Sequence, residues 1–113
     1  MGGRRRVWEP QPSETPSTFL GAQMLFMIIE RFKDRDPSPI YARLREQGRS
    51  LPEGLRFVDS WVEVNFDRCF QLMECDDAAL MQRWILQWRD LAKFEVVPVC
   101  PSKAVRELFP PGG

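Results

Sequence analysis

Residues 56–77 read RFVDSWVEVNFDRCFQLMECDD, and this stretch decides the fold. Apolar residues recur along two segments, 55–64 and 68–76, which are separated by a short turn around Asn65, Phe66 and Asp67. This pattern predicts a β-hairpin. The hairpin also carries several carboxylates, and a charged side chain within a strand must face water, a partner or a site.

The sequence before the hairpin predicts a strand and then a helix. MLFMIIERF at 24–32 is apolar on both faces as far as Glu30, which is typical of a covered central strand. Ser38 followed by Pro39 predicts an N-cap and the first helical residue. Gly48 offers a stop for the helix at its C-terminal end.

The sequence after the hairpin predicts a second helix and a last strand. Asp76 and Asp77 supply an N-cap and negative charge at the start of a helix over 77–92. Its apolar residues repeat at helical spacing, which indicates a core-facing stripe. KFEVVPVCP at 93–101 predicts a strand, and Pro98 confines that strand to a sheet edge.

The predicted order is strand, helix, strand, strand, helix, strand, which is the ferredoxin-like βαββαβ unit of the α+β class. Its four-stranded antiparallel sheet has both helices on one face. A bare sheet face of this size is normally buried by a partner. We therefore expect a homodimer that forms through the open face.

An even turn places one mixed aromatic and acidic set of side chains on a single face of the hairpin. The opposite set is small and nearly uncharged, which suits packing under helices, so the mixed set is expected on the open face. These candidate cavity-lining residues are Phe57, Asp59, Trp61, Glu63, Phe70, Leu72 and Glu74.

Four segments carry a resemblance to a known family: MLFMIIERF, REQGRSLPEGLRFVDSWVE, RCFQLMECDD and FEVVPVCPSK. Over about residues 24–103 the chain resembles the bacterial family catalogued as domain of unknown function 3303 (DUF3303). That family is similar in fold to the dimeric α+β barrels, in which two subunits press their open sheets around a shared interior. The wider group includes antibiotic-biosynthesis-type monooxygenases, muconolactone isomerase-like proteins and haem-handling barrels. The resemblance implies a small-molecule barrel but no particular catalytic residue.

The domain is expected to span residues 24–103. Residues 1–23 mix Arg, Pro, Ser and Gly without periodicity, which predicts a disordered tail. Met24 opens the first apolar run, which suggests either that translation starts there or that residues 1–23 are a dispensable tail. Residues 104–113 are expected to form a flexible C-terminal tail.

Composition narrows the function. Sixteen basic residues balance sixteen acidic ones, so we expect neither a nucleic-acid nor a membrane partner. The chain has no His, which excludes His-based catalysis and His-ligated haem, and we expect no cofactor or metal. Cys69 and Cys75 would lie roughly 20 Å apart on one strand, beyond disulfide reach. Reduced thiols indicate a cytoplasmic protein.

These observations favour a protein that binds a small organic molecule in an open-sheet cavity. Asp59, Glu63 and Glu74 would orient the ligand, and a raised pKa is expected for Asp59 or Glu74. One alternative is a noncatalytic dimerising protein whose acids pair with Arg31, Arg56 or Arg68 at the interface. Another is a cofactor-free enzyme that resembles a monooxygenase or an isomerase.

Overall fold

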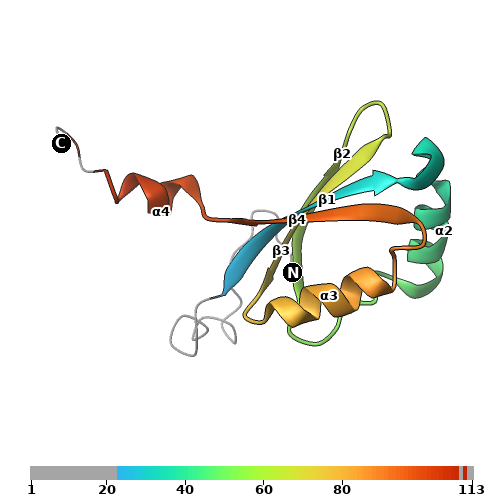
Figure 1. The fold of residues 1–113 in the computed structure, drawn as a ribbon, viewed down its shortest axis with the longest axis horizontal. Coiled ribbons are helices and arrows are strands. Elements are labelled where there is room, and N and C mark those ends of the chain that lie inside the picture. The colour runs from blue at the N-terminus through green and yellow to red at the C-terminus, as the bar shows by residue number, and fades with distance from the viewer. Residues whose placement is uncertain (1–22, 110, 112–113) are drawn as a thin grey trace.

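The computed structural model describes residues 23–109 and 111, and it has the predicted ferredoxin-like α+β fold (Figure 1). The antiparallel sheet has the strand order β2-β3-β1-β4. Its strands are β1 (Met24–Phe32), β2 (Arg56–Val62), β3 (Arg68–Cys75) and β4 (Ala92–Val99). The helices are η2 (Lys33–Arg35), α2 (Ser38–Gln47), α3 (Ala78–Leu86) and α4 (Ser102–Arg106).

Helix α2 begins with a different cap from the one predicted. Pro37, not Ser38, is the N-cap residue, and the Asp36 carboxylate accepts a hydrogen bond from the Ser38 backbone N–H at 2.9 Å. Asp36 is the better partner because Pro37 has no side-chain acceptor and Ser38 is already helical. Gly48 ends the helix as predicted, with φ of 68°, a backbone angle that favours glycine.

Helix α3 begins as predicted and ends earlier. Asp77 is its N-cap and accepts from the Ala79 backbone N–H at 3.0 Å. The predicted helix over 77–92 is too long, because the helix ends at Leu86 and turns lead into β4. The Gln87 carbonyl accepts from the Arg43 guanidinium at 2.8 Å, so a side chain of α2 satisfies a backbone group where the helix stops.

The hydrophobic core lies between the sheet and helices α2 and α3. Ile28, Met73 and Cys75 are fully buried on the helix-facing side of the sheet. Trp84 of α3 packs edge-to-face on Phe94 of β4, with ring centroids 5.6 Å apart. The apolar stripe predicted for α3 is therefore core, as its spacing indicated.

A β-bulge in β2 changes which residues face the helices. Phe57 pairs with Met73 and Asp59 pairs with Leu72, so Val58 is an extra residue in β2. An extra residue reverses the alternation of the strand on one side of it. The prediction that Phe57 shares a face with Asp59 is therefore wrong: Phe57 packs against the core with Met73.

The opposite face of the sheet is apolar at its centre. Met27 and Ile29 of β1 pair with Leu72 and Phe70 of β3, and all four side chains are half-buried. Trp61 of β2 lies beside Phe70 and is 50% exposed. Strand β4 is an edge strand as Pro98 predicted. This open face is the surface for which the sequence predicts a partner.

The chain continues past β4 into α4, which projects away from the body of the domain (Figure 1). Helix α4 runs across residues 103 and 104, where the sequence predicts that the domain ends and the C-terminal tail begins. The position of this domain boundary remains a prediction. Val105, Leu108 and Phe109 are exposed. The predicted N-terminal tail lies outside the described residues, apart from Gln23. None of the helices described has the length and apolar character needed to cross a membrane.

Candidate functional site

The predicted carboxylates of the hairpin are found in ion pairs or at the surface. Glu63 follows β2 and accepts from the Arg68 guanidinium at 2.6 Å. Glu74 lies 3.2 Å from the Arg56 guanidinium. Asp59 is exposed and accepts from the adjacent Ser60 backbone N–H at 2.8 Å. The two ion pairs are those expected if the acids only set an interface.

The hairpin brings part of the predicted set together on the open face. The two strands place Trp61 opposite Phe70 and Asp59 opposite Leu72. Glu74 is 8% exposed, and burial raises the pKa of its carboxyl, although the Arg56 charge lowers it in part. The direction of this shift is the one predicted for Asp59 or Glu74.

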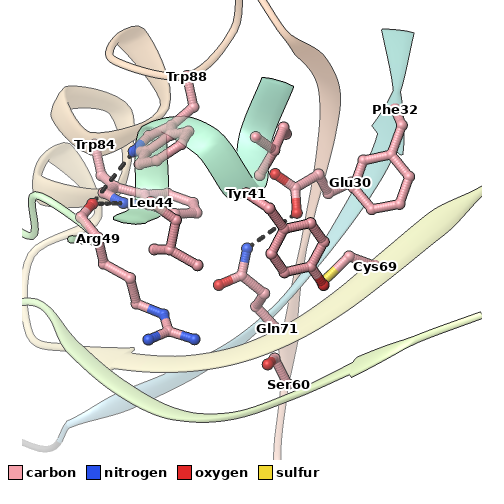
Figure 2. A pocket seen from close by; sticks show the side chains of 11 residues that line it. Glu30, Phe32, Tyr41, Leu44, Arg49, Ser60, Cys69, Gln71, Trp84 and Trp88 are labelled. Atoms are coloured by element: carbon pink, nitrogen blue, oxygen red, sulfur yellow. Dashed lines mark hydrogen bonds between the residues drawn. The ribbon is translucent and has the colours of Figure 1, made fainter. Parts of the chain in front are cut away.

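A cavity of about 80 Å³ lies on the other side of the sheet, beneath helices α2 and α3 (Figure 2). Its wall is apolar on the helix side and polar on the sheet side. The lining residues are Glu30, Phe32, Ile40, Tyr41, Leu44, Arg49, Ser60, Cys69, Gln71, Trp84 and Trp88. Sequence reasoning did not find this site, because it followed the acids of the hairpin to the open face.

Glu30 is the most deeply buried acid of the cavity. It is 3% exposed and follows Phe26 and Ile28 in the helix-facing alternation of β1. The Gln71 side-chain amide donates to Glu30 Oε1 at 3.1 Å. Burial raises the pKa of Glu30, while hydrogen bonding from Cys69 and Gln71 lowers it in part. The position of Glu30 in this alternation, within an otherwise apolar strand, is the sequence signal for the site.

The thiol and the phenol of the cavity are held in their neutral forms. Burial, followed by the charge of Glu30, raises the pKa of Cys69 to about 12. Burial also raises the pKa of Tyr41. A thiol is nucleophilic only as the thiolate, so Cys69 is unsuited to covalent chemistry at neutral pH. All three cysteines are free, as predicted.

Arg49 supplies the positive charge of the cavity. Its backbone carbonyl accepts hydrogen bonds from the indole N–H groups of Trp84 and Trp88, at 2.9 and 3.2 Å. Figure 2 shows these two bonds and the Arg49 side chain extending from them among the lining residues. The guanidinium carbon lies 3.6 Å from the centroid of the Phe57 ring. Burial lowers the pKa of Arg49, but a guanidinium stays charged at neutral pH.

The loop that carries Arg49 is fixed at a second point. The Gln87 side-chain amide donates to the Ser50 carbonyl at 2.9 Å. The indole bonds and this bond tie residues 49 and 50 to the end of α3. Because the bulge turns Phe57 toward the helices, the same loop also gains an aromatic surface for the guanidinium. The Arg49 guanidinium is therefore held in position by the anchored loop and by the Phe57 ring.

The arrangement combines one buried acid, one amide and one cation with an apolar wall. An arrangement of this kind can orient a small organic molecule with a few polar contacts. The acid is also suited to proton transfer, since burial brings its pKa toward neutral pH. Among residues 23–109 and 111, no cluster of three Cys, Asp or Glu side chains is arranged to hold a metal ion.

The fold and the cavity define a small ferredoxin-like α+β protein with a polar pocket between its sheet and its helices. Comparison of the sequence with known families then places it more narrowly. The chain belongs to the family described as a domain of unknown function (DUF3303), which matches residues 24–113. No curated protein and no solved structure matches the chain.

Proposed function

We propose that this protein binds a small organic molecule in the cavity beneath helices α2 and α3. The observation that carries the proposal is the pairing of Glu30 with Gln71 inside an otherwise well-packed core. A buried carboxyl costs stability unless something offsets its desolvation. A protein that needed only a packed core would gain from an apolar residue at this position. The buried acid therefore favours a role in ligand binding.

The location of the pocket is a change from the open-sheet cavity expected from the hairpin. Two adjacent residues of β2 can distinguish the two locations experimentally. Ser60 lines the cavity, whereas Asp59 lies on the open face of the sheet. Ser60→Leu is designed to fill the cavity. Asp59→Leu is the matched control, because it adds the same side chain at the next position.

The test is a ligand-observed NMR screen of small organic fragments against the full chain. Fragments that bind the wild type should be lost with Ser60→Leu and retained with Asp59→Leu. The reverse pattern would place the binding site on the open face. Native mass spectrometry of the purified protein gives a second readout, because a retained ligand appears as a fixed added mass.

The same acid favours a second candidate, a cofactor-free enzyme that moves a proton on its ligand. Glu30 is the group suited to this role, because its carboxyl lines the cavity and burial raises its pKa. Glu30→Gln then separates the candidates. If the wild type turns over a ligand found in the screen and Glu30→Gln loses that turnover, the protein is an enzyme of this kind, whereas a binding protein leaves the ligand chemically unchanged.

The open face supports a further proposal, that a second copy of the chain covers it. Half-buried apolar side chains at its centre and Trp61 beside them would leave an apolar surface in water. Charges of both signs surround this centre, including the Arg68–Glu63 and Arg56–Glu74 pairs. In a dimer with a two-fold axis, the same face of each subunit meets the other, so positive side chains of one copy can lie opposite negative side chains of the second. The pocket and this interface then use opposite faces of the sheet.

A further inference from the structure

In the described part of the chain the Arg49 guanidinium forms no ion pair, and Glu30 interacts with it electrostatically at longer range. The ion pairs of the described residues involve other arginines, and the hydrogen bonds of Arg49 use its backbone carbonyl. A guanidinium has five N–H donors and no acceptor. Stacking on Phe57 covers the flat face of the group and leaves the donors at its edge.

This unsatisfied charge is half-buried, and it is held in place. The loop bonds to Trp84 and Trp88 fix the backbone from which the side chain extends. A half-buried charge that forms no ion pair is costly, because the more distant charge of Glu30 offsets only part of the lost hydration. The donors are therefore preorganised for an acceptor that comes from outside the chain. Planar, two-pronged donors of this kind suit a carboxylate.

The surroundings of Arg49 limit the charge of such a ligand. The titratable groups that interact with it electrostatically are Cys69, Glu30 and Tyr41, which become negative or stay neutral. A second negative charge on the ligand would face these acidic groups without a second cation to offset it. One cation in this setting favours one negative charge.

The size of the cavity limits the body of the ligand. Its volume of about 80 Å³ is roughly half of an apolar cavity of about 150 Å³ that accepts benzene. The remaining wall includes Leu44 and the two tryptophan rings, which suit a short carbon chain. At the polar end, Glu30 and Gln71 offer hydrogen bonds to one further group.

We infer that the pocket takes a small monocarboxylic acid, whose carboxylate pairs with Arg49 and whose short body lies against the apolar wall. This inference rests on the proposed binding function and adds the chemical class of the ligand. It also assigns Arg49 as the residue that selects for charge. Gln71 and Glu30 then select among acids that carry a second polar group.

The test uses propionate, together with propionamide as a neutral molecule of the same shape. The reporters are the indole N–H signals of Trp84 and Trp88 in the nitrogen-15 spectrum of the full chain, because both groups donate to Arg49. Propionate should shift these signals in a saturable way and bind about tenfold or more tightly than propionamide. Equal binding of the two probes would overturn the inference, and this comparison needs no variant.

Variants give the second arm. Arg49→Met should weaken propionate binding about tenfold or more, and Arg49→Lys should weaken it less because the charge stays without the paired donors. Arg31→Met is the matched control, since Arg31 is an exposed arginine outside the cavity, and it should keep wild-type affinity. Wild-type affinity in the Arg49→Met protein would overturn the inference. Unfolding curves show whether each variant folds.

The two proposals fail in different ways. If neutral fragments bind and Ser60→Leu blocks them while propionate gains nothing from Arg49, the pocket stands and the carboxylate inference falls. If neither propionate nor any neutral fragment shifts the indole signals of Trp84 and Trp88, both fall.

Discussion

The shared acceptor of Trp84 and Trp88 gives a quantitative prediction. Both indole N–H groups donate to the Arg49 carbonyl, at 2.9 and 3.2 Å. Replacing either residue by Phe removes one hydrogen bond, worth about 1 kcal/mol, and leaves a small void that costs about 1 kcal/mol more. The remaining indole still satisfies the carbonyl. Each single variant should therefore lose about 2 kcal/mol in the free energy of unfolding.

The double variant should lose more than the sum of the two single losses. It removes the last indole donor from the Arg49 carbonyl, and an unsatisfied polar group costs about 1 kcal/mol or more. The expected coupling between Trp84→Phe and Trp88→Phe is thus about 1 kcal/mol. The Arg43 guanidinium carbon lies 5.6 Å from the centroid of the Trp88 ring, and Phe at position 88 keeps an aromatic ring for this contact. The coupling energy of the cycle therefore reports the loss of the two indole N–H donors.

Urea denaturation at neutral pH measures this cycle, provided that all four proteins unfold with the same dependence on urea. The double variant should also weaken propionate binding, because the Arg49 loop loses two of its anchors to α3. Losses that add to within about 0.3 kcal/mol would refute the reasoning. The Arg49 carbonyl would then be satisfied by water, and the indoles would contribute packing alone.

Three further predictions concern single side chains. The pKa of Glu30 in the folded state is above its ordinary value of about 4.5, so stability falls as pH rises from about 4.5 to the folded-state pKa. Glu30→Gln should reduce this fall when urea denaturation is repeated between about pH 4 and about pH 8. An unchanged dependence of stability on pH would contradict this prediction. Trp61→Glu should weaken the proposed dimer in sedimentation equilibrium. Leu86→Glu, at a 65% exposed position on α3, is the control and should not weaken it. A wild-type protein that stays monomeric at micromolar concentration would contradict the dimer proposal. Iodoacetamide at neutral pH should alkylate the exposed Cys100 in the folded protein and should react with Cys69 only after unfolding, because Cys69 is buried and its pKa is about 12. Peptide mapping that finds modification of Cys69 in the folded protein would contradict this prediction.

The order of elements could be predicted from sequence because each signal was local. The apolar run at 24–32, the cap at Asp77, the stop at Gly48 and the edge proline at Pro98 all act within a few residues of the structure that they determine. The end of α3 could not be predicted in this way. The turn after Leu86 is supported by Arg43, a residue of the other helix that lies far away in the sequence.

The candidate site was not predicted, because the predicted residues were placed on the open face of the sheet and the cavity lies on the other face. Strict alternation was assumed through the whole of β2, and the bulge at Val58 breaks it. That change moves Phe57 beneath Arg49 and leaves Asp59 on the open face. The sequence alone does not determine which way Glu30 faces, and the pairing of β1 with both neighbours places it under the helices. Arg49 lies in a loop, whose position no periodic pattern determines.

The alternation of β2 and β3 has a consequence for how this protein can change over generations. Ser60 and Trp61 are neighbours in the chain, as are Phe70 and Gln71, yet the members of each pair point to opposite faces. Point substitutions can therefore alter the ligand preference or the assembly surface one at a time. A one-residue insertion or deletion in β2 acts differently, because it exchanges the two surfaces. Val58 marks the place where the strand already carries such an extra residue, so the alternation of β2 reverses there.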